Sequence, residues 1–113
     1  MEKLTKEKQT LLLSLIKNKN FKEIEILILS LVETEKEKPF LLNLLGVSKL
    51  NKKNLNKEEA TSEAIEAQNL FKKAYIKDNL FFEALYNFAQ TSIKTLNHEN
   101  ALVLLEENLK KVK

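Results

Sequence analysis

The sequence contains no cysteine and no arginine, and it has one glycine, one proline and one histidine. The absence of cysteine excludes disulfides, thiolate nucleophiles and cysteine-ligated zinc. A single glycine excludes a glycine-rich phosphate loop. The lone histidine, His98, has no second histidine or cysteine with which to share a metal ion, and a polar residue at a helix start is its simplest interpretation. We therefore predict no catalytic residue, no metal ion and no cofactor, and a protein that is not an enzyme.

Lysine supplies all 19 basic residues, and the net charge is +3. Arginine is the residue that grips phosphates and guanine with two parallel hydrogen bonds, so its absence argues against nucleic-acid binding. A basic surface that binds RNA or DNA is therefore the least favoured alternative. Its lysines would be Lys52, Lys53, Lys57, Lys72, Lys73 and Lys77. The simpler interpretation of this cluster is a solvated helix face.

The balance of 43% hydrophobic and 31% charged residues is typical of a folded globular chain. No apolar run approaches the ~18 residues that a membrane span needs. The lysines before "LLLSLI" superficially resemble a signal peptide, but the run has six residues and no small-residue cleavage site. We expect one domain over residues 1–113, a cytoplasmic location and no contact with membranes.

Polar breaks divide the sequence into about six helical segments, and no segment alternates like a half-buried strand. The first helix is expected at about 4–17 and the second after Asn20, where Glu23 completes a capping-box pattern. Pro39 begins the third, because its missing N–H is harmless at the first helical position. The fourth begins after either Asn56 or Ser62. The last two are expected at 80–96 and 98–112, and the charged run 33–38 reads as a solvated helix end.

Equivalent residues recur at a fixed interval. Leu12 and Gly46 lie 34 residues apart, as do Phe71 and Leu105. Gly46 and Ala89 lie 43 residues apart, which is nine more. The sequence therefore predicts three repeated units, of which the middle one contains a nine-residue insertion in the polar stretch 51–62.

This register resembles the tetratricopeptide repeat (TPR), a 34-residue helix-turn-helix unit. The units would cover about 5–38, 39–81 and 82–113. The middle unit matches best, with Leu42, Leu45, Gly46, Ala67, Phe71 and Ala74 at the family's contact positions. Departures are the missing unit-ending proline and the usual tyrosine, replaced by Leu15, Lys49 and Ser92. The resemblance implies an all-α superhelix of three antiparallel helix pairs without a β-sheet.

Gly46 stands inside an apolar helical run, where glycine costs ~1 kcal/mol relative to alanine. In a TPR unit it would face Ala67 where the two helices cross, and a larger side chain would push them apart. We therefore predict a close approach of a neighbouring helix at Gly46. The alternative is a tolerated weak point on an exposed face.

The resemblance also implies a function, because first helices of successive TPR units line a concave groove that receives a peptide or partner helix. The groove residues would be Gln9, Phe40, Asn43, Val47, Tyr86, Gln90 and Lys94. They could equally be ordinary solvent-facing residues. One TPR subfamily clamps C-terminal carboxylates, but this chain has Gln9, Leu13, Leu44 and Asn87 at the clamp positions, so we predict no such specificity. The expected partner is another protein or a peptide.

The end of the sequence suggests a second class of function. The segment "ALVLL" at 101–105 is apolar in every direction, whereas a terminal repeat normally needs a polar outer face. We expect this face to be covered, either by a continuing chain of a larger protein or by a second copy. In a homodimer the self-association residues would be Leu104, Leu105 and Leu109.

Overall fold

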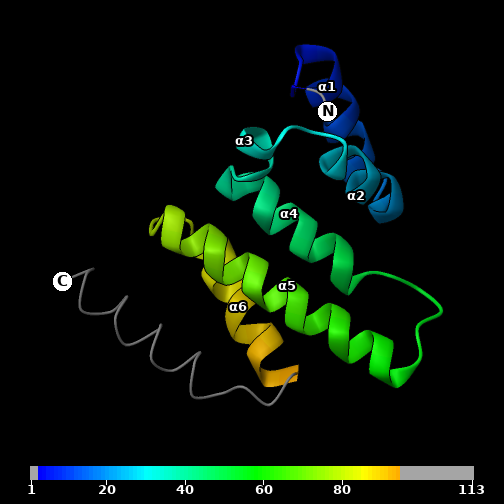
Figure 1. The fold of residues 1–113 in the computed structure, drawn as a ribbon, viewed down its shortest axis with the longest axis vertical. Coiled ribbons are helices and arrows are strands. Elements are labelled where there is room, and N and C mark those ends of the chain that lie inside the picture. Colours follow the sequence, from blue (N-terminus) through cyan, green and yellow to red (C-terminus); the bar gives the residue numbers. More distant parts are fainter. Residues whose placement is uncertain (1–2, 95–113) are drawn as a thin grey trace.

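A computed structural model describes residues 3–94 of the chain as six α-helices joined by turns and one longer loop (Figure 1). In chain order they are α1 (Lys6–Lys17), α2 (Phe21–Leu29), α3 (Glu33–Lys36), α4 (Pro39–Leu50), α5 (Lys57–Lys77) and α6 (Phe82–Lys94). Residues 3–94 form no β-sheet. The predicted all-α class is therefore confirmed. None of the described helices is both long enough and apolar enough to cross a membrane.

Local capping signals place three of the helix starts. The Thr5 hydroxyl accepts a hydrogen bond from the Lys8 N–H at 3.3 Å and begins α1. Pro39 occupies the first turn of α4, as predicted. Asn56 begins α5 with a complete capping box, in which its side chain accepts from the Glu59 N–H at 2.8 Å and Glu59 accepts from the Asn56 N–H at 3.3 Å. Of the two predicted starts for this helix, Asn56 is the observed one.

One local prediction is corrected. Asn20 precedes α2, but its side chain caps nothing, because its backbone lies at φ −87° and ψ 73°, outside the extended conformation that Thr5 and Asn56 adopt. The capping box with Glu23 is therefore wrong. In the polar stretch 51–62, residues 51–56 connect α4 to α5 and residues 57–62 belong to α5, as a start after Asn56 requires.

Residues 3–94 form six helices, but these are not the six that the sequence predicted. The single-turn helix α3 was not predicted, because its charged sequence read as a solvated helix end. The predicted helix at 98–112 lies outside the described residues.

The core surrounds α4. On one side its leucines share a cluster with α1 and α2, which contains Leu12, Ile24, Ile28, Leu31, Leu41, Leu44 and Leu45. On the other side, Leu42 packs with Tyr75 of α5 and Leu85 of α6. Figure 1 shows α4 and α5 side by side and antiparallel, with α6 behind α5. Each long helix thus packs on the next along the chain, while the superhelical stacking of a TPR array stays a prediction.

Gly46 is buried, so its placement on an exposed face is wrong. A Cβ built on Gly46 would lie 2.5 Å from Cε1 of Phe71, and the three nearest atoms all belong to the Phe71 ring. The close approach is therefore confirmed, but the neighbour is Phe71, one turn of α5 beyond the expected Ala67. Glycine at this position lets a buried aromatic ring touch the backbone of α4.

Candidate interaction surface

A pair of asparagine side chains joins α4 and α6. Nδ2 of Asn87 donates a hydrogen bond to Oδ1 of Asn43 at 3.0 Å, across 44 residues of sequence. Within residues 3–94 no partner is present for the other two polar groups of the pair, Nδ2 of Asn43 and Oδ1 of Asn87. We call the surface around this pair the α4–α6 face, with Phe40, Asn43, Tyr86, Asn87 and Gln90 as its members.

The predicted groove residues differ in exposure. Phe40 and Tyr86 have 52% and 63% of their surface exposed, and Gln90 is exposed as well. Asn43 is only 5% exposed, so it forms the floor of the face. These residues lie on α4 and α6, which the asparagine pair connects.

Three other predicted groove residues are not members of the α4–α6 face. Val47 is half-buried and packs against the cluster of Ala67, Phe71 and Phe88, so it serves the core. Gln9 is exposed on α1, and its Nε2 donates to the Leu4 carbonyl at 3.5 Å. The side chain of Lys94 lies outside what the structure describes.

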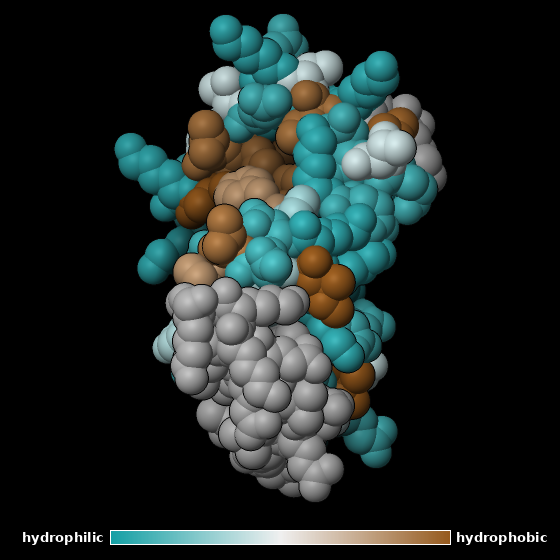
Figure 2. Space-filling model, turned by 90° about the vertical axis from the view of Figure 1, so that its left-hand side faces the viewer, coloured by the Kyte–Doolittle hydropathy of each residue, from teal (hydrophilic) through white to brown (hydrophobic). Residues whose placement is uncertain are grey.

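Exposed apolar side chains gather on one side of the molecule. Figure 2 shows them in the upper part of the view, at the height of α3 and the start of α4, with hydrophilic side chains around them. An exposed apolar group with a polar rim is typical of a surface that binds a partner.

Buried hydrogen bonds fix the rotation of α6 and therefore the direction of Tyr86. Nε2 of Gln68 on α5 donates to Oγ of Ser92 at 2.8 Å. The Ser92 hydroxyl in turn donates to the Phe88 carbonyl at 2.8 Å. Because both partners are buried, a rotation of α6 would leave polar groups without hydrogen bonds, at about 1–3 kcal/mol each.

The lysine cluster considered for nucleic acid is partly neutralised. Lys73 and Lys77 both bind Glu37, at 2.7 and 3.1 Å. Lys52 binds Glu63 at 3.1 Å and Glu25 at 3.4 Å. Three of the six lysines thus have carboxylate partners, which weakens the attraction of this surface for phosphates.

Ion pairs shift the pKa values of two glutamates, Glu37 and Glu66, and of Lys52. Hydrogen bonds from Lys73 and Lys77 hold the pKa of Glu37 below its ordinary value, and a hydrogen bond from Lys49 does the same for Glu66. For Lys52, burial lowers the pKa, but the hydrogen bond with Glu63 and the charges of Glu25 and Glu63 outweigh it and raise the pKa. These ion pairs connect α2, α4 and α5 with one another and with Glu37, which follows α3.

Residues 3–94 contain no group of three histidine, cysteine, aspartate or glutamate side chains placed to hold a metal ion. His98 and the predicted self-association residues Leu104, Leu105 and Leu109 lie outside the described residues, so the self-association hypothesis stays a prediction.

By sequence, Asn87 occupies a clamp position of the TPR groove, but it was not included among the predicted binding residues. It lies three residues before Gln90 and therefore on the same side of α6, which was an available signal. Its pairing with Asn43 required the tertiary structure.

Comparisons with protein-family models, with curated proteins and with solved structures find no match to this chain. The resemblance to TPR units therefore rests on the spacing of residues alone.

Proposed function

We propose that this chain is a protein-interaction module without chemistry of its own, which binds a peptide or a partner helix on the α4–α6 face. The observation that carries the proposal is the asparagine pair between α4 and α6. Within residues 3–94 it leaves one donor, Nδ2 of Asn43, and one acceptor, Oδ1 of Asn87, without a hydrogen-bond partner. An extended peptide backbone presents the complementary groups, C=O and N–H, along each edge.

The aromatic residues beside the pair supply the anchoring energy. Tyr and Phe bury a large area at a low cost in conformational entropy, and binding energy concentrates in such residues. Phe40 and Tyr86 are both more than half exposed and belong to the two helices that the asparagine pair connects. A partner side chain that covers them would gain apolar burial while its backbone meets the amides.

The TPR resemblance supports the same surface, because α4 and α6 are the first helices of the second and third proposed units. In that family the first helices face the ligand. The self-association and nucleic-acid alternatives have no comparable support, since one rests on residues outside the described part and the other on lysines of which half are paired.

The test is a selection of binding peptides from a displayed random library, followed by calorimetry with the best peptide. Tyr86→Ala and Gln90→Ala both change exposed side chains and should leave folding intact. We expect Tyr86→Ala to weaken binding about tenfold or more, as for the central residues of other interfaces.

The matched control is Ile76→Ala on α5. Ile76 has the same exposed fraction as Tyr86, 63%, but lies on a helix outside the proposed face. Equal losses in the two variants would contradict the proposal, as would a library that yields no saturable binder.

A further inference from the structure

A second surface of the molecule contains a cavity of about 560 Å³. It lies between the start of α2 and the end of α4 with its following loop, and shares no residue with the α4–α6 face. Its lining residues fall within 19–26 and 48–55. The inserted loop therefore builds one wall of the cavity.

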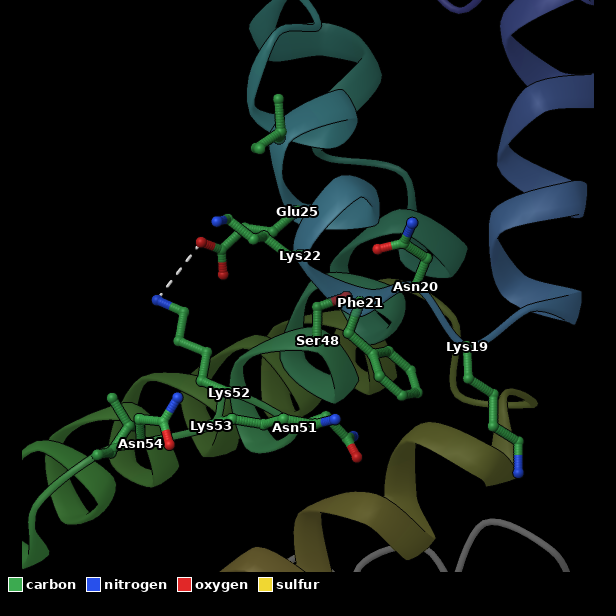
Figure 3. Close-up of a pocket in the computed structure, with 12 residues that line it drawn as sticks. Lys19, Asn20, Phe21, Lys22, Glu25, Ser48, Asn51, Lys52, Lys53 and Asn54 are labelled. Atoms are coloured by element: carbon green, nitrogen blue, oxygen red, sulfur yellow. Dashed lines mark ion pairs between the residues drawn. The ribbon is translucent and has the colours of Figure 1, made fainter.

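The charges of this cavity do not balance. It contains four lysines and a single glutamate, Glu25, which already binds Lys52 at 3.4 Å (Figure 3). The other three lysines, Lys19, Lys22 and Lys53, form no ion pair within the part of the chain that the structure describes. A ligand for this cavity should therefore carry negative charge.

The positive charges are also spread out. Figure 3 shows Lys19 at one end of the cavity and the pair of Lys52 and Glu25 at the other, with Phe21 between them. Lys22 lies at the Glu25 end. A chain with carboxylates at separated positions can meet both ends at once.

The walls between the lysines are apolar or amide-bearing. Phe21, Ile26 and Leu55 supply apolar surface, and Ile26 is 53% exposed. The side chains of Asn20 and Asn54 have no hydrogen-bond partner among residues 3–94. Such walls suit an apolar side chain and a peptide backbone.

We propose that this cavity binds an extended acidic peptide segment of another protein. An apolar side chain of that segment packs on Phe21 and Leu55, and its carboxylates lie against Lys19, Lys22 and Lys53. The proposal does not depend on the function proposed for the α4–α6 face, because the two surfaces are lined by different residues.

Lys19 allows a test in which one substitution changes stability and binding in opposite directions. It has φ 54°, in the left-handed region, and it closes the end of α1 with the hydrogen bonds Lys19 N–H to Ile16 C=O and Asn20 N–H to Leu15 C=O. Glycine is the residue that adopts this position without strain. Lys19→Gly should therefore stabilise the fold while it removes a proposed ligand contact, so that a loss of binding could not be attributed to unfolding.

The experiment is an amide NMR titration of the chain with a short synthetic peptide in which two leucines are flanked by aspartates and glutamates. We expect saturable shifts at residues 19–26 and 48–55. The triple variant Lys19→Glu/Lys22→Glu/Lys53→Glu should bind about tenfold or more weakly. The control Lys3→Glu/Lys6→Glu/Lys72→Glu makes the same charge change at exposed lysines outside the cavity and should bind like the parent. Lys19→Gly should raise the urea midpoint and weaken binding.

Several results would overturn the inference. Equal losses in the two triple variants would mean that only the net charge matters. Equal binding of a peptide with asparagine and glutamine in place of the acids would exclude charge recognition. Displacement of the peptide by inorganic phosphate, with the same shifts, would identify a site for small anions. Shifts confined to α4 and α6 would contradict this cavity while supporting the function proposed for the other surface.

Discussion

Gly46 shows how one residue can decide a helix packing. An ordinary side chain there would gain helix propensity, but its Cβ would fall within 2.5 Å of the Phe71 ring. Phe71 is fully buried, so its ring has no solvent to move into. The absence of a side chain at this point lets α4 and α5 approach along their length.

At the residue scale we predict that Gly46→Ala destabilises the fold. Alanine gains ~1 kcal/mol of helix propensity, but overpacking a core costs about 1–3 kcal/mol, and the clash with a ring places this case at the upper end. We expect a net loss of about 1–2 kcal/mol in the free energy of unfolding, measured with urea.

The control for this prediction is the double variant Gly46→Ala/Phe71→Leu. Leucine removes the clashing ring atoms, so the alanine should be tolerated better in that background than in the parent. If the two substitutions change the free energy of unfolding additively, the Phe71 ring can move aside for alanine. A Gly46→Ala protein as stable as the parent would show the same.

At the scale of elements, two asparagines in similar sequence patterns behave differently. Asn56 and Asn20 are each followed three residues later by glutamate, and both precede a helix. Only Asn56 forms the capping box. The backbone of Asn20 follows the tight turn after α1 and lies at ψ 73°, and its side chain forms no capping hydrogen bond.

We predict that Asn56→Ala lowers the free energy of unfolding by about 1 kcal/mol, because it leaves the Glu59 N–H without an acceptor. Asn20→Ala is the matched control and should lower it by less than about 0.5 kcal/mol, since no capping bond is lost. Urea denaturation of the two proteins measures the difference, and equal losses would contradict the assigned caps.

At the scale of the whole molecule, ion pairs connect segments that are distant in sequence. One chain of pairs runs from Glu25 on α2 through Lys52 of the loop to Glu63 on α5, and continues through Lys49 on α4 to Glu66. A second joins Glu37, after α3, to two lysines of α5. Together they hold the inserted loop and α3 against the rest of the fold.

These pairs predict a loss of stability in acid. The folded-state pKa values of Glu37 and Glu66 lie below the ordinary 4.5, so their contribution is complete above that pH. It is lost as the pH falls through the lowered pKa values, when the folded state must bind protons that the unfolded state already holds. We therefore expect a thermal midpoint that is nearly constant from neutral pH down to about 5 and decreases below 4.5.

The double variant Glu37→Gln/Glu66→Gln tests the assignment. It should melt below the parent at neutral pH and show a shallower decrease in acid. The control Glu58→Gln/Glu83→Gln makes the same charge change at glutamates that form no ion pair within residues 3–94, and its profile should run parallel to that of the parent. A parallel profile for the first variant would assign the acid sensitivity to other groups.

The sequence by itself determined the helical class and the helix start at Pro39, and it limited the start of α5 to Asn56 or Ser62. Those signals act through hydrogen bonds and steric limits that span three or four residues, and such short-range effects survive in any tertiary context. It also indicated that Gly46 lies under a neighbouring helix, because an isolated glycine in an apolar helix needs a packing reason.

Only the tertiary structure decided which residues meet. The stacking of the helices decides which ring lies over Gly46 and that Asn43 pairs with Asn87. It also decides that Asn20 does not cap α2 and that a cavity forms beside the loop between α4 and α5. Stacking angles follow from the summed packing of many apolar side chains, and no single residue encodes them. Residue types and their periodicity therefore predicted the long helices of residues 3–94 but not α3, while the pairing of Asn43 with Asn87 depends on a contact between residues 44 apart.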